Sequence, residues 1–94
     1  MKRMYIIYRV TLRNILRITQ LTHHQLFTSK PDHCVTARAV LVSTLLAQGF
    51  SEMDIARISG MCQQKVNRLK NALRYRASSL FARTLAEELR ATPN

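Results

Sequence analysis

The chain has 94 residues, enough for one small domain, and 47% of them are hydrophobic, which is too many for an intrinsically disordered protein. Fifteen lysines and arginines against five acids give a formal charge of +10, which predicts a polyanionic partner. Nucleic acid is the first candidate for this partner and acidic lipid is the second. With five acids, three histidines and no catalytic triad, we expect no enzyme, no small-molecule substrate and no cofactor.

Residues 1–30 form an N-terminal segment with six basic residues and no acid. Its arginines recur every four residues, at Arg9, Arg13 and Arg17, and its apolar residues fall on the opposite side of a helix. Side-chain character also alternates along the stretch 4–14, which is rich in β-branched and aromatic residues, and this pattern fits a strand. We nevertheless favour one amphipathic helix from about Met4 to Phe27. The arginine stripe can bind phosphate or lipid, or be solvated, and these alternatives stay open.

The second part of the chain, residues 31–94, begins at Pro31 and holds the main helical pattern. Apolar periodicity predicts helices over about 34–48, 52–59, 62–76 and 79–91. With the N-terminal helix they make an all-α fold of about five helices. A break near Ser78 and Ser79 separates the last two, because the apolar stripe changes register there.

Local signals mark the ends of these helices. Gly49 is expected to cap the helix over 34–48 in the left-handed conformation. Ser51 and Asp54 have the spacing of a capping box at the start of the next helix. Gly60 is expected to make a tight turn at positive φ before the helix over 62–76. The methionines at 4, 53 and 61 are expected in the core.

Neither the cysteines nor the N-terminus indicates a metal site or an exported protein. Cys34 and Cys62 fit no CxxC pattern, and no histidine lies at a usual metal-ligand spacing from them. The first residues begin like a signal peptide, but arginines interrupt the apolar run. No stretch has the apolar length of a transmembrane helix. We therefore expect a cytoplasmic protein with reduced thiols and no bound metal.

The stretch IARISGMCQQKVNRL, residues 55–69, resembles the helix-turn-helix of the lactose-repressor family. The wider frame, residues 34–76, is similar to the Trp-repressor-like DNA-binding domains, which include the C-terminal domain of the bacterial replication initiator. This chain has Cys-Gln-Gln at 62–64, where the initiator has Asp-His-Thr. The residues that match the lactose-repressor pattern are Ile55, Ala56, Ser59, Gly60, Met61, Val66 and Leu69.

This resemblance implies that residues 52–76 form a DNA-binding helix-turn-helix whose second helix enters the major groove. Amide side chains match the hydrogen-bonding edge of adenine, and arginine matches that of guanine. Other basic side chains contact the phosphates and fix the register of the protein on the DNA. The predicted base contacts are Gln63, Gln64, Asn67 and Arg68. The predicted phosphate contacts are Lys65, Lys70, Arg74 and Arg76.

The sequence therefore predicts sequence-specific binding to double-stranded DNA by a small bacterial, phage or plasmid transcription regulator. The single helix that reads the bases, which we call the reader helix, covers a short half-site. We therefore expect a homodimer, with residues 1–30 as the dimerisation element. Two alternatives remain: a helix-turn-helix-shaped protein-interaction module, and an accessory DNA-binding protein of replication or recombination. A further alternative is a basic protein that binds RNA or a membrane surface through residues 1–30.

Overall fold

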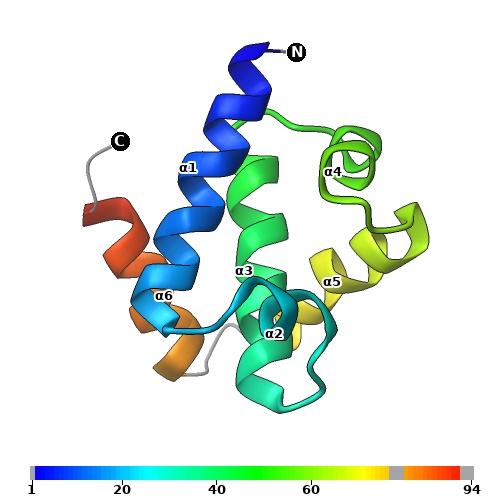
Figure 1. Ribbon diagram of the computed structural model, residues 1–94. Helices are drawn as coiled ribbons and strands as arrows, with labels where there is room; N and C mark the ends of the chain where they lie inside the picture. The colour runs from blue at the N-terminus through cyan, green and yellow to red at the C-terminus, as the bar shows by residue number, and fades with distance from the viewer. Residues whose placement is uncertain (1, 77–79, 92–94) are drawn as a thin grey trace.

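A computed structural model describes residues 2–76 and 80–91, without the side chains of residue 2 and residues 74–76. All of the regular secondary structure in these residues is helical, which confirms the all-α prediction (Figure 1). The helices are α1 (Lys2–Thr19), α2 (His23–Thr28), α3 (Asp32–Ala47), α4 (Glu52–Ser59), α5 (Gln63–Arg76) and α6 (Leu80–Ala91).

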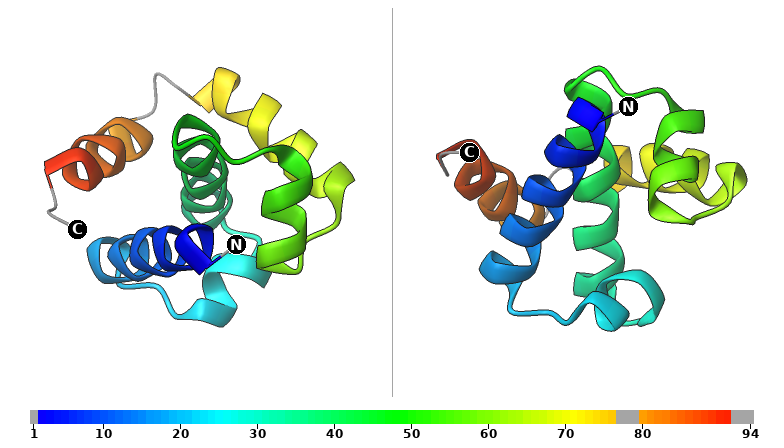
Figure 2. Two further views of the ribbon diagram at one scale, coloured as in Figure 1. Left: turned by 90° about the horizontal axis from the view of Figure 1, so that it is seen from above. Right: turned by 45° about the horizontal axis from the view of Figure 1, so that its top comes forward.

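Helix α3 is the centre of the fold, and every other helix packs against it (Figures 1 and 2). Its apolar residues lie on all sides, which is typical of a helix surrounded by others. The buried residues of α3 are Cys34, Thr36, Ala37, Arg38, Ala39, Val40, Leu41, Val42 and Leu45. The apolar stripe predicted for this helix, at Ala37, Val40, Leu41, Leu45 and Leu46, is therefore one part of a wider buried surface. After α3, Gly49 adopts φ +101°, in agreement with its predicted role at the helix end.

The N-terminal segment holds two helices, so the prediction of one helix from Met4 to Phe27 was wrong. The chain turns after α1 at Gln20, whose φ is +60°. Thr22 then begins α2 with a capping box: its hydroxyl accepts from the Gln25 N–H at 3.1 Å, and its own N–H donates to the Gln25 side chain at 2.9 Å. This Thr-x-x-Gln signal was present in the sequence. Residues 4–14 are helical, as favoured over a strand.

Helix α1 belongs to the same core as the other helices. Tyr8, Thr11 and Ile15 are buried, and α1 packs against both α3 and α6. The core runs without interruption from α1 to α6, across the boundary predicted at residue 31. The apolar face of α1 is therefore covered within the chain, by α3 and α6.

Buried Arg38 ties α2 to α3. Its Nε donates to the carbonyl of Leu26 at 2.6 Å, and its Nη2 donates to the carbonyl of Ser29 at 2.9 Å. These carbonyls lie at the C-terminal end of α2, where a cation is favourable. The arginine therefore fixes a helix of six residues that has one fully buried apolar side chain, Leu26.

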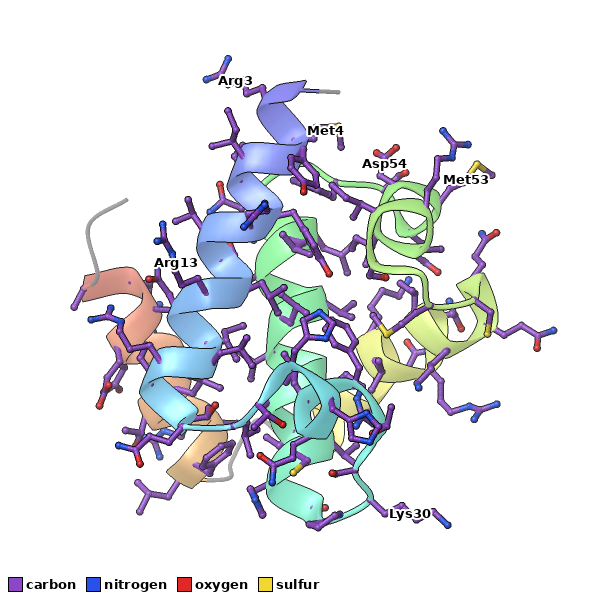
Figure 3. The ribbon with its side chains drawn as sticks, in the orientation of Figure 1. Arg3, Met4, Arg13, Lys30, Met53 and Asp54 are labelled. Atoms are coloured by element: carbon purple, nitrogen blue, oxygen red, sulfur yellow. The ribbon has the colours of Figure 1, made fainter. Side chains whose placement is uncertain are left out.

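The remaining predictions about the core have mixed outcomes. Met61 is buried and Met4 is half-buried, but Met53 is 53% exposed on α4, so its predicted place in the core was wrong. Figure 3 shows the Met53 side chain projecting from α4. Helix α6 buries Ala82 and Leu85. The predicted break at Ser78 and Ser79 lies outside the described residues.

Candidate nucleic-acid interface

Helices α4 and α5 and the turn between them have the bounds predicted for the helix-turn-helix. The capping box at the start of α4 is confirmed: the Ser51 hydroxyl accepts from the Asp54 N–H, and the Asp54 carboxylate accepts from the Ser51 N–H, each at 3.0 Å. The α4 helix ends at Ser59 and is capped by Gly60, whose φ is +81°, as predicted. Its N–H donates to the Ala56 carbonyl at 3.0 Å, which closes the last turn.

The two helices are held together by apolar side chains from both of them. Ile55 and Val66 are fully buried, and Met61 and Leu69 are less than 10% exposed. The α5 helix also packs against α3, which supports its inner side. Because these contacts fix the inner face of α5, the direction of its outer face is fixed as well.

The outer face of α5 carries the four predicted base-contact residues, Gln63, Gln64, Asn67 and Arg68, all of them exposed. They line one shallow depression together with Glu52, Asn71 and Ala72. The structure therefore brings the predicted set together on one surface. It adds Glu52 and Asn71, of which Glu52 comes from α4.

Glu52 binds the polar face of α5 through both carboxylate oxygens. Oε2 lies 2.8 Å from the Lys70 ammonium, and Oε1 accepts from the Asn67 amide at 3.0 Å. The Asn67 carbonyl oxygen in turn accepts from the Asn71 amide at 3.3 Å. The hydrogen bonds from Lys70 and then from Asn67 hold the pKa of the Glu52 carboxyl below its usual value. The sequence does not reveal this cluster, because its acid lies on a different helix, 18 residues before the lysine.

Both lysines predicted to contact phosphate already have partners in the protein. Lys70 is half-buried beside Glu52. The Lys65 ammonium donates to the carbonyl of Phe27 at 3.4 Å, which joins α5 to α2. Arg74 and Arg76 lie on α5, but their side chains are outside the described residues. Of the predicted cationic contacts whose side chains are described, Arg68 is the one that is exposed.

Other kinds of site find little support in the described part of the chain. No group of three or more His, Cys, Asp or Glu residues there is arranged to hold a metal ion. Cys34 is buried and Cys62 is exposed, and both are free thiols. No helix of residues 2–76 or 80–91 is both long and apolar enough to cross a membrane.

Comparison of the chain with protein-family models, with curated proteins and with solved structures gives no match. The functional interpretation therefore depends on the residues of the α4–α5 surface and on their geometry.

Proposed function

We propose that this protein binds double-stranded DNA in a sequence-specific manner, with α5 in the major groove, and that it regulates transcription. The observation that carries the proposal is the outer face of α5: three amides and a guanidinium are exposed together on a helix whose inner face is anchored. In a helix-turn-helix, such side chains near the start of the second helix reach base edges.

The chemistry of this face suits base edges better than it suits phosphate alone. Amide groups donate and accept in the pattern that adenine presents in the major groove, and arginine pairs with guanine. A face that acted by charge alone would need lysine or arginine at these positions. The Glu52 carboxylate also restrains Asn67, which lowers the entropy lost when that amide binds a base.

The proposal includes a homodimer in the cytoplasm. The reader helix has 14 residues, a length of about 21 Å, and so covers only a short half-site. Two-fold symmetry is the common way to extend such a site, and it makes the operator palindromic. A selected operator with two inverted half-sites, together with a dimer by light scattering, is the expected result.

Selection of bound duplexes from a random pool, followed by titration of variants, tests this function. Gln64→Ala should cost about 1–3 kcal/mol on the selected site and little on scrambled DNA. Gln48→Ala, which removes an exposed glutamine after α3, is the matched control and should change neither affinity. An unchanged ratio of specific to non-specific affinity in Gln64→Ala would place base reading elsewhere. Salt-insensitive, weak DNA binding would favour a protein-interaction module instead.

A further inference from the structure

The outer face of α1 is a strongly basic surface, separate from the polar face of α5. Its exposed side chains are Arg3, Tyr5, Ile6, Arg9, Arg13 and Arg17. Successive arginines from 9 to 17 are four residues apart, about 6 Å along the helix axis, and form one continuous row. No acid occurs in residues 1–31, so nothing on this helix offsets the charge.

This face is directed away from the candidate interface on α5. Tyr8, Thr11 and Ile15 point into the core, and the arginine row lies on the opposite side of α1. Helices α1 and α5 lie on different sides of α3 in each view (Figures 1 and 2). Figure 3 shows Arg3 and Arg13 projecting from α1 away from α3. The molecule measures 33 × 30 × 23 Å, so its body separates the arginine row from the polar face of α5.

The arginine row is available for a partner. The side chains of Arg9, Arg13 and Arg17 are exposed, and the ion pair described in the structure, between Lys70 and Glu52, lies on the other side of the molecule. Arg9 instead donates to the Tyr5 hydroxyl at 3.3 Å, with its guanidinium 5.7 Å from the Tyr5 ring centre. Helix α6, which packs beside α1, carries two arginines and two glutamates, whose charges cancel. The net charge of this side of the molecule is therefore set by the arginines of α1 and is positive.

Charge and burial together identify the kind of partner. Stable insertion into a lipid surface needs a free apolar face, and that face of α1 is already packed against α3 and α6. The large hydrophobic side chains that α1 leaves exposed are Tyr5 and Ile6, which are too few to form such a face. A second copy of the chain would place arginines against arginines across a two-fold axis, which is unfavourable. A row of arginines with a neighbouring tyrosine hydroxyl matches the phosphate backbone of nucleic acid.

We propose that the outer face of α1 binds the phosphate backbone of a second DNA duplex, so that one protein molecule bridges two DNA segments. The inference rests on the proposed function of α5 for the first segment. Binding on α1 is independent of sequence, because its contacts are to phosphates and not to base edges. The protein therefore joins a specific site to any DNA nearby.

A two-duplex capture experiment tests the bridge. Beads carry the selected site, and a labelled duplex of scrambled sequence is added with the intact protein. Arg13→Gln/Arg17→Gln should keep binding to the beads but lose capture of the labelled duplex. The matched control, Lys30→Gln/Arg83→Gln, removes the same charge: Lys30 precedes α3, and Arg83 lines a groove with α3 and α5 residues. It should capture normally.

The other outcomes overturn either the bridge or the proposed function on which it rests. Equal loss of capture in both double variants would mean that net charge alone holds the second duplex. Normal capture by Arg13→Gln/Arg17→Gln, with loss of binding to phosphatidylglycerol vesicles, would assign the face to anionic lipid. Failure of the intact protein to bind the bead-bound site would instead refute the proposed function. Binding of that site without capture refutes this inference alone.

Discussion

Gly60 offers a direct test of whether the turn between α4 and α5 sets the position of α5. Its φ of +81° lies in a region that costs a residue with a side chain about 1–2 kcal/mol. A Cβ added there would meet no atom within 4 Å, so backbone strain is the whole expected effect and no steric clash adds to it. The structure therefore predicts a graded series of substitutions.

Gly60→Asn should be the mildest change, because asparagine tolerates the left-handed conformation. Gly60→Ala should cost about 1 kcal/mol, the strain being offset in part by the lower entropy of the unfolded chain. Gly60→Val should cost up to about 3 kcal/mol, because a β-branched residue is most strained there. For a domain of this size, each 1 kcal/mol lowers the Tm by about 4–8 °C, which calorimetry resolves.

Gly49 supplies the matched control, since its φ is +101° and a Cβ there also meets nothing within 4 Å. Gly49→Ala should lose a similar amount of stability but lies before α4, outside the turn that joins α4 to α5. DNA affinity, measured well below the Tm of both variants, should fall in Gly60→Ala and stay near normal in Gly49→Ala. Equal stability of the Asn and Val variants at position 60 would refute the strain argument. Equal loss of DNA affinity in the two alanine variants would refute a special role for the turn.

Three further predictions concern the polar contacts. Arg38→Met should destabilise the protein by about 3 kcal/mol in denaturant titrations, because two charge-assisted hydrogen bonds are lost, one buried and one partly buried. A loss below about 1 kcal/mol would contradict this. Glu52→Gln should release Lys70 toward phosphate, which raises affinity for scrambled DNA. The plot of log affinity against log salt concentration should become steeper by about 0.9, as one more phosphate contact implies. An unchanged slope would mean that Lys70 does not reach the DNA. Hydrogen bonds from the Ser51 backbone, and then from its side chain, lower the pKa of the Asp54 carboxyl. The stabilisation by the Asp54 carboxylate is therefore present above the usual carboxyl pKa and is lost as pH falls below about 4. The stability of Asp54→Asn should therefore fall less steeply with acid, and an acid transition identical to that of the intact protein would argue against the capping box.

Features that depend on neighbours in the sequence were predicted from it. Ser51 and Asp54 satisfy the first N–H groups of α4 from within one turn, and Gly60 adopts a conformation that its missing Cβ allows. The periodic positions of Ile55, Val66 and Leu69 identified the buried side of the motif. The boundary between α1 and α2 was equally local, and the Thr22–Gln25 signal would have located the start of α2.

The tertiary structure alone decided which polar groups find partners. Glu52 meets Lys70 because α4 packs against α5, and the Lys65 ammonium reaches the Phe27 carbonyl because α2 and α5 both pack against α3. The exposure of Met53 follows from the same cause, since α4 turns that side chain to solvent. Helix caps and turns are set within four residues along the chain, whereas these contacts join segments 18 and 38 residues apart. Their existence depends on the crossing of helices around α3, which hydrophobic periodicity does not specify.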